Sequence, residues 1–247
     1  MSRPPVILEI CVDSVASAVA SQEGGALRVE LCADLAAGGT TPSAGTIEET
    51  RRRISIGLHV MIRPRGGDFC YSEEEFETMK RDVLLARELK AEGVVFGILR
   101  PDDSIDRERM NELAQLARPM EVTCHRAIDV SRDPFESLEV LADVGVNRIL
   151  TSGGASTVDE GLSGIRELVA RSKGRVTIMA GSGINVGNVQ KLIKETGVRD
   201  VHILTPVTKP SKSTGGAFRL YGPNPPQVDA AAVKAFVSLL STRMDAD

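Results

Sequence analysis

Two cysteines, Cys11 and Cys32, have the type and placement that suggest metal chemistry. Each ends a short aliphatic run, Val6–Val12 and Arg28–Cys32. If these runs are neighbouring strands, about 4.8 Å apart, strand alternation turns both sulfurs to one face and brings them close. Paired thiolates form a soft site suited to Cu(I). Residue type alone favours a simpler interpretation, two small buried apolar side chains, because free cysteine is among the most buried residues. No CxxC or HExxH motif indicates a zinc site.

Charged side chains fall on the same predicted face as the two sulfurs. Alternation places Glu9, Glu30, Arg63 and His125 opposite the aliphatic residues of their runs. Unpaired charges are costly to bury, so we expect them to pair with one another or with a ligand. Glu9, Glu30 and His125 are therefore candidate catalytic residues that move protons in an enclosed site. A purely structural network of paired charges is the alternative. The alternation turns all three histidines inward: His59, His125 and His202.

Glycine-rich segments after three of the runs are candidate anion-binding loops. Arg63 and Arg65, close to Asp68, could hold a carboxylate or phosphate in a forked geometry. Gly181 and Gly183 precede a predicted helix, where free amide groups attract anions. Ser152 and its following glycines make a similar segment after the sixth run. Tight turns with solvated arginines and close packing at glycine explain the same residues without a ligand.

Eight aliphatic runs along the chain are predicted strands that would position these residues. Their starts are separated by 22 to 35 residues, which leaves room for one crossover helix each time. Alternating strands and helices give a parallel sheet, and eight units in this length predict a TIM (β/α)8 barrel forming a single domain over residues 1–247. The runs are Val6–Val12, Arg28–Cys32, Leu58–Pro64, Gly93–Leu99, Met120–Ala127, Arg148–Gly153, Arg175–Gly181 and Asp200–Pro206.

Capping signals support the helices between the runs. Ser72 followed by Glu75 is a capping box, and Asp133 before Pro134 places a cap and then a proline at the first helical position. Cys124 precedes the inward His125 and should therefore face the helices. The one long irregular stretch is 205–228, after the last run, which we expect to form a loop at the mouth of the barrel.

The composition is that of an ordinary globular protein. The 247 residues are 42% hydrophobic and 26% charged, with a net charge of −4. There is no broad basic field, so we expect no nucleic-acid partner. The first ten residues do not resemble a signal peptide and no run is long enough to span a membrane, so we expect a cytoplasmic protein with reduced thiols and no membrane partner.

Several motifs resemble the copper homeostasis protein CutC family. The matches span Leu8 to about His202 in the expected order, and the string RPRGGDF-x-YS is the most specific of them. They are LEICVDS (8–14), RVELC (28–32), GGTTPSAG (38–45), IRPRGGDFCYS (62–72), TCHRAID (123–129), ILTSG (149–153) and IMAGSGI (178–184).

The resemblance implies a TIM barrel, a cytoplasmic location, homo-oligomerisation as a dimer or tetramer, and a link to copper handling. The proposed Cu(I) ligands of the family fall on Cys11 and Cys32. The resemblance implies no particular reaction, and it does not extend to the loop after His202. The polar set of the family falls on Glu9, Glu30, Arg63, Arg65, Asp68, His125, Arg126 and Asp129, which adds Arg126 to the anion-binding candidates and Asp129 to the catalytic ones.

Two function classes follow from these observations. The first is a cytoplasmic copper homeostasis protein that binds Cu(I) through thiolates at the carboxyl rim of the barrel. The second is a TIM-barrel enzyme that acts on a small anionic or phosphorylated metabolite, which the polar lining of the barrel favours. An interaction scaffold is a third possibility, but it leaves the inward charges unexplained.

Overall fold

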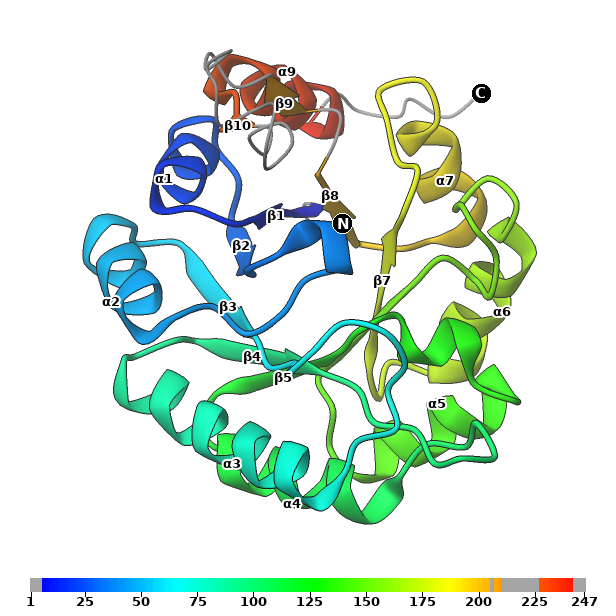
Figure 1. Ribbon diagram of the computed structural model, residues 1–247. Helices are drawn as coiled ribbons and strands as arrows, with labels where there is room; N and C mark the ends of the chain where they lie inside the picture. The colour runs from blue at the N-terminus through cyan, green and yellow to red at the C-terminus, as the bar shows by residue number, and fades with distance from the viewer. Residues whose placement is uncertain (1–5, 205–206, 210–226, 242–247) are drawn as a thin grey trace, which may run out of the picture.

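Eight parallel strands close into a barrel in the computed structural model, which describes residues 6–204, 207–209 and 227–241. Each strand pairs with the next along the chain, and β8 pairs with β1 to close the ring (Figure 1). The predicted TIM-barrel fold is confirmed. The strands are β1 (Ile7–Val12), β2 (Arg28–Leu31), β3 (Gly57–Met61), β4 (Gly93–Phe96), β5 (Glu121–Cys124), β6 (Arg148–Thr151), β7 (Thr177–Gly181) and β8 (Asp200–Ile203).

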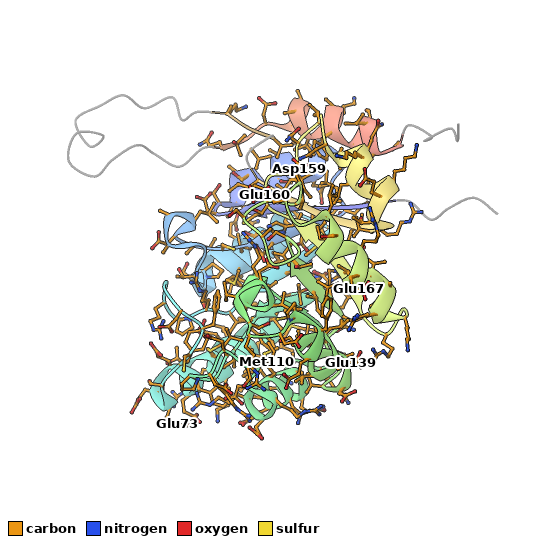
Figure 2. The ribbon with its side chains drawn as sticks, turned by 90° about the vertical axis from the view of Figure 1, so that its right-hand side faces the viewer. Glu73, Met110, Glu139, Asp159, Glu160 and Glu167 are labelled. Carbon is orange, nitrogen blue, oxygen red and sulfur yellow. The ribbon has the colours of Figure 1, made fainter. Side chains whose placement is uncertain are left out.

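Helices surround the barrel on its outside (Figure 1). Their outer faces are polar, as shown by Glu139 and Glu167 on two neighbouring helices (Figure 2). None of the helices in the described part of the chain is long and apolar enough to cross a membrane. The helices are α1 (Val15–Glu23), α2 (Ala44–Arg53), α3 (Glu73–Glu88), α4 (Arg107–Ala117), α5 (Pro134–Asp143), α6 (Leu162–Ser172), α7 (Val189–Thr196) and α9 (Ala230–Ser241), with short 3-10 turns η1 (Leu35–Ala37) and η2 (Arg126–Val130).

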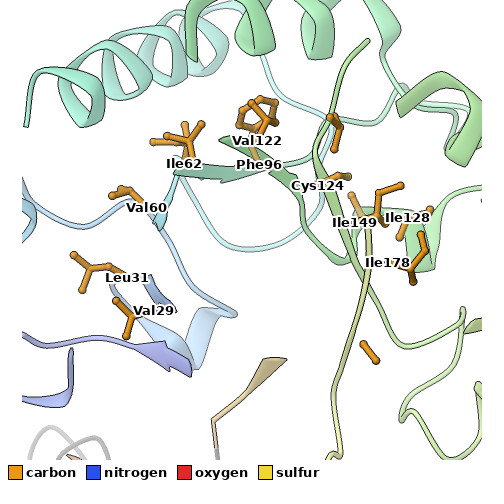
Figure 3. Packing of buried hydrophobic residues seen from close by; sticks show 14 of the residues in the cluster. Val29, Leu31, Val60, Ile62, Phe96, Val122, Cys124, Ile128, Ile149 and Ile178 are labelled. Atoms are coloured by element: carbon orange, nitrogen blue, oxygen red, sulfur yellow. The ribbon is translucent and has the colours of Figure 1, made fainter. Parts of the chain in front are cut away.

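The main hydrophobic core lies between the barrel and the helices. Leu8 and Ile10 of β1 belong to this core. The alternate residues of the strand, Glu9 and Cys11, face the barrel interior. Figure 3 shows the outward aliphatic side chains of several strands, with Cys124 among them. The predictions of strand alternation and of a core position for Cys124 are confirmed. Burial also raises the pKa of the Cys124 thiol to about 12, so it stays protonated.

Helix starts follow the capping signals of the sequence. The side chain of Ser72 accepts a hydrogen bond from the amide of Glu75, and the carboxylate of Glu75 accepts one from the amide of Ser72. Asp133 caps α5, and Pro134 occupies its first position. These caps fix where α3 and α5 leave the rim of the barrel.

The predicted loop at 205–228 is partly ordered into secondary structure. Thr208–Lys209 (β9) pairs antiparallel with Gln227–Val228 (β10), immediately before α9. The predicted irregular stretch is therefore interrupted by a short two-stranded sheet. Residues 205–206 and 210–226 of this predicted loop lie outside the described residues.

The loop after β6 packs backbone to backbone against the start of α6. A Cβ on Gly161 would lie 1.8 Å from the carbonyl oxygen of Ser152, and one on Gly164 would lie 2.4 Å from that of Gly153. Only glycine permits this approach, which holds the Ser152 loop at the rim.

Replacing Gly161 should therefore destabilise the fold by steric overlap. We expect Gly161→Ala to lower the free energy of unfolding by about 3 kcal/mol, because backbone must move to make room for the methyl group. Gly45→Ala is the matched control, since nothing lies within 4 Å of a Cβ at that position. Urea denaturation measures both variants, and equal midpoints would contradict the packing described.

Candidate metal centre

Two thiols face each other inside the barrel. Cys11 is on β1 and Cys32 directly follows β2, and their Sγ atoms are 3.9 Å apart. Cys11 pairs in register with Glu30, so Cys32 lies two residues further along its strand. The separation is well beyond the length of a disulfide bond, about 2.05 Å. It is close to the roughly 4.6 Å that two metal–thiolate bonds of about 2.3 Å would span in a line.

A carboxyl group and an imidazole extend this pair. The Oε2 atom of Glu30 is 3.6 Å from Cys32 Sγ and 3.7 Å from His202 Nε2. The other oxygen, Oε1, is buried and has no hydrogen-bond partner among the described residues. Glu30 therefore connects the sulfurs to the imidazole of β8, and the three strands involved are neighbours because the barrel closes between β8 and β1 (Figure 1).

Glu9 holds the imidazole from its other side. His202 Nδ1 is 2.7 Å from Glu9 Oε1, and the second oxygen of Glu9 pairs with Arg28. Arg28 also contacts Asp200 at 2.8 Å. Asp200 in turn pairs with Arg148 at 3.0 Å. Glu9 thus pairs with other inward charged residues, although its partners are residues that sequence reasoning did not assign to the site.

A cavity of about 600 Å³ adjoins this cluster. Cys11 and His202 line it, together with Arg126 at its rim. The loop after β7 supplies further lining residues, including Gly183. The cluster is therefore buried yet lies next to a space that a small ligand or an ion can enter.

Comparison with known proteins agrees with this geometry. The family model described as "CutC family" matches residues 6–206. The chain belongs to the CutC family.

Relatives and a solved structure have the same family name. A CutC family protein of Parabacteroides distasonis is 50% identical over 197 residues, covering 79% of this chain and 81% of the relative. The copper homeostasis protein cutC homolog of Mus musculus is 45% identical over 213 residues, covering 86% and 77%. The crystal structure of a CutC protein from Streptococcus agalactiae superposes with a TM-score of 0.77 at 35% identity, covering 80% of this chain and 97% of that one.

Burial and close contacts set the protonation of the centre of this CutC chain. The hydrogen bond from Cys32 and the nearby His202 lower the pKa of Cys11 to about 5 against the effect of burial. The same hydrogen bond and burial raise the pKa of Cys32 well above its usual value. Burial raises the pKa of Glu30. Burial opposes a charge on His202, but Glu30, Cys11 and Glu9 raise its pKa well above the usual value. These contacts favour the thiolate form of Cys11, which is the form that binds metals.

His125 lies away from the sulfurs. It follows β5, on the far side of the closed barrel from β1. Its Nδ1 accepts a hydrogen bond from the amide of Ala127 at 3.2 Å, and its ring lies 4.6 Å from that of Phe69. Burial and the charge of Arg63 lower the pKa of His125 to about 3. The structure does not bring His125 together with Glu9 and Glu30.

The arginines expected to form an anion fork have partners within the protein. Arg63 donates to the carbonyl oxygens of Ala37, Gly39 and Gly67 at 2.7 to 3.0 Å, which ties the loop after β2 to the loop after β3. Arg65 pairs with the carboxylate of Glu75 at 2.6 Å and with Asp68 at 3.0 Å. The two guanidinium groups therefore bind protein acceptors in the described part of the chain.

Asp129 holds the loop after β6. Its carboxylate accepts hydrogen bonds from the amides of Ser152 and Gly154, both at 3.0 Å, and pairs with Arg126 Nε at 2.8 Å. The hydroxyl of Ser152 also donates to it, at 3.1 Å. The amide groups expected to bind an anion here thus already surround a carboxylate of the protein. The predicted anion-binding residue Gly181 packs closely against Leu150, because a Cβ at this position would lie 2.6 Å from the Leu150 side chain.

Sequence reasoning missed His202 and Arg28 as members of the centre. Alternation already placed His202 on the inner face, which was the available signal. The alternation pattern does not give the register between strands. The register between β8 and β1 sets Glu9 opposite His202, and the register between β1 and β2 sets Glu9 opposite Arg28.

The neutral, buried His125 predicts a loss of stability in acid. Its pKa is about 3 in the folded protein and about 6.5 when unfolded, so the unfolded chain binds the extra proton as the pH falls below 6.5. Between pH 7 and pH 5 this should cost about 2 kcal/mol of unfolding free energy. Urea denaturation of the wild type and of His125→Asn at both pH values measures the effect. Equal losses in the two proteins would show that His125 does not titrate in this way.

Proposed function

We propose that this chain is a copper homeostasis protein that binds Cu(I) through the thiolates of Cys11 and Cys32. The observation that carries the proposal is the pair of buried sulfurs 3.9 Å apart beside a cavity. Thiolates are soft ligands and select Cu(I) over harder ions. The relatives in Mus musculus and Homo sapiens, each 45% identical, are named copper homeostasis protein cutC homologs, which supports the same role here.

The surroundings of the sulfurs suit a bound Cu(I) ion. Cys11 and Cys32 pack with Met61 and Val95 in a small apolar cluster inside the barrel, with Leu35 and Leu204 at its edge. Such a lining excludes water from the sulfurs while the adjoining cavity leaves a route for the ion. Copper is the cargo in this function, and the residues that hold it are those two thiols.

Cellular location and assembly belong to the same proposal. Cu(I) and free thiols both require reducing conditions, so we place the protein in the cytoplasm. All four cysteines are free in the structure, which is compatible with that setting. We also propose a homo-oligomer, an inference that rests on the family resemblance.

Removing both thiols should abolish Cu(I) binding. We expect the double variant Cys11→Ser, Cys32→Ser to lose Cu(I) to a competing chelator such as bicinchoninate, because hydroxyl groups are poor ligands for a soft ion. Copper-to-protein stoichiometry under anaerobic conditions measures retention.

Two other thiols provide matched controls. Cys70→Ser and Cys124→Ser should keep the wild-type stoichiometry, because Cys124 is in the outer core and Cys70 is in the loop after β3. Unchanged stoichiometry in the double variant would contradict the proposed ligands.

The cavity favours a second candidate function, an enzyme acting on a small anionic or phosphorylated metabolite. Its volume of about 600 Å³ suits a small molecule. Arg126 in the cavity lining provides positive charge. His202, also in the lining, and Glu30, 3.7 Å from it, are groups able to move protons. In this function Glu9, which the sequence predicted to move protons, would instead be a positioning residue that orients His202.

A thermal-shift screen with phosphorylated sugars and inorganic phosphate tests the second function. A true ligand at 100 times its dissociation constant stabilises the protein by about 2.7 kcal/mol. Arg126→Gln should weaken the shift at least tenfold in apparent affinity, whereas Arg65→Gln should not, because Arg65 does not line the cavity. A wild type that shows no shift with any of these compounds would rule out this candidate.

A further inference from the structure

Four potential metal ligands of three chemical kinds meet in the centre, although the sequence has no zinc motif. Cys11 comes from β1, Glu30 and Cys32 from β2 and its end, and His202 from β8. Cys11, Cys32 and Glu30 offer ligand atoms that lie within 4.8 Å of one another, and Glu30 is likewise within 4.8 Å of His202. Glu30 is the common member that joins the two sulfurs to the imidazole.

Three of the separations between these atoms are close to those of tetrahedral coordination. The Sγ atoms of Cys11 and Cys32 are 3.9 Å apart. Glu30 Oε2 is 3.6 Å from Cys32 Sγ and 3.7 Å from His202 Nε2. Ligands bound to Zn²⁺ at about 2.0–2.3 Å in a tetrahedron stand roughly 3.3–3.8 Å from each other. His202 belongs with Glu9 and Glu30 to a separate group from Cys11, Glu30 and Cys32, so a movement of the His202 side chain toward the sulfurs completes the tetrahedron.

An unpaired oxygen in the centre points to a missing cation. Glu30 is 2% exposed, and its Oε1 atom has no hydrogen-bond partner among the described residues. A buried polar atom without a partner costs free energy, so its presence calls for a ligand. A metal ion between the sulfurs and His202 would bind this carboxyl group through Oε2, the oxygen that faces Cys32 and His202, or through Oε1 after a rotation of the carboxyl group.

A carboxylate already orients the imidazole of His202 as a metal ligand requires. The contact between His202 Nδ1 and Glu9 Oε1, 2.7 Å long, leaves Nε2 directed toward Glu30. Metal-bound histidines commonly donate their other nitrogen to a carboxylate in this way, which fixes the tautomer and the ring orientation. Arg28 holds Glu9 in turn.

We propose that Cys11, Cys32, Glu30 and His202 bind one Zn²⁺ ion with tetrahedral geometry. The proposal shares two thiols with the proposed Cu(I) site but does not depend on it, because it adds two ligands that Cu(I) does not need. Zn²⁺ accepts sulfur, nitrogen and oxygen together, and four ligands are its usual number in proteins. The cavity beside Cys11 and His202 provides the entry path.

The test measures Zn²⁺ and Cu(I) binding separately on the same variants. Metal-free protein is titrated with Zn²⁺ alone against a chromophoric chelator. We expect one Zn²⁺ per chain in the wild type, and at least a 100-fold loss of Zn²⁺ affinity in His202→Gln and in Glu30→Gln. The same two variants should retain Cu(I) with wild-type stoichiometry, because both thiols remain. His125→Gln, on the other side of the barrel, is the control and should bind Zn²⁺ like the wild type.

Cobalt substitution keeps the proposal testable if a variant fails to fold. Co²⁺ in the wild type should give the intense visible bands of tetrahedral coordination together with thiolate-to-cobalt charge transfer. The absence of these bands would overturn the four-ligand site, and so would wild-type Zn²⁺ affinity in His202→Gln and Glu30→Gln.

A wild type that keeps Cu(I) but does not bind Zn²⁺ would overturn this inference and leave the copper function standing. Loss of Cu(I) binding alone would overturn only the copper function.

Discussion

The geometry of the centre depends on one buried carboxylate. Glu9 is fully buried inside the barrel. An isolated charge there would be prohibitively costly, so it requires partners on more than one side. Arg28 supplies the opposite charge and His202 supplies the hydrogen-bond donor. Burial raises the pKa of Glu9, but these contacts together lower it well below the usual range, so Glu9 stays ionised. Because it is anchored by Arg28, Glu9 fixes the direction in which His202 presents its other nitrogen.

The interior of this barrel is divided into two parts of different chemistry. One part is an ionic network in which Arg28 and Arg148 share Asp200. The other is the cluster of Cys11 and Cys32 with their apolar neighbours. Barrels of this fold are usually filled with branched aliphatic side chains, and buried ion pairs seldom stabilise a fold more than apolar packing does. The network fixes the positions of Glu9 and His202, while the apolar shell between strands and helices is the main hydrophobic core.

The sequence alone predicts the fold well because the fold depends on patterns that are local. Eight aliphatic runs, their spacing and caps such as Ser72 with Glu75 all act within a few residues, and the structure follows them. Alternation also separates Cys124 from the inward residues. The partners of the site residues depend instead on register between strands that are far apart in the chain. Glu9 and His202 are joined only because β1 pairs with β8 at the closure of the barrel, and no local pattern specifies that. Arg63 likewise bonds carbonyl groups of loops whose course a sequence does not reveal.

The proposed Cu(I) and Zn²⁺ sites use different parts of the centre. A Cu(I) ion would need only the sulfurs of Cys11 and Cys32, whereas a Zn²⁺ ion would also bind Glu30 and His202. Soft thiolate ligands suit both Cu(I) and Zn²⁺, so selectivity between the two must come from geometry and from the other ligands. Four ligands brought into a tetrahedron favour the ion that prefers four, while the two sulfurs alone favour the ion that accepts two. The position of His202 relative to the sulfurs, set by its contact with Glu9, is therefore the feature that separates the two proposed sites.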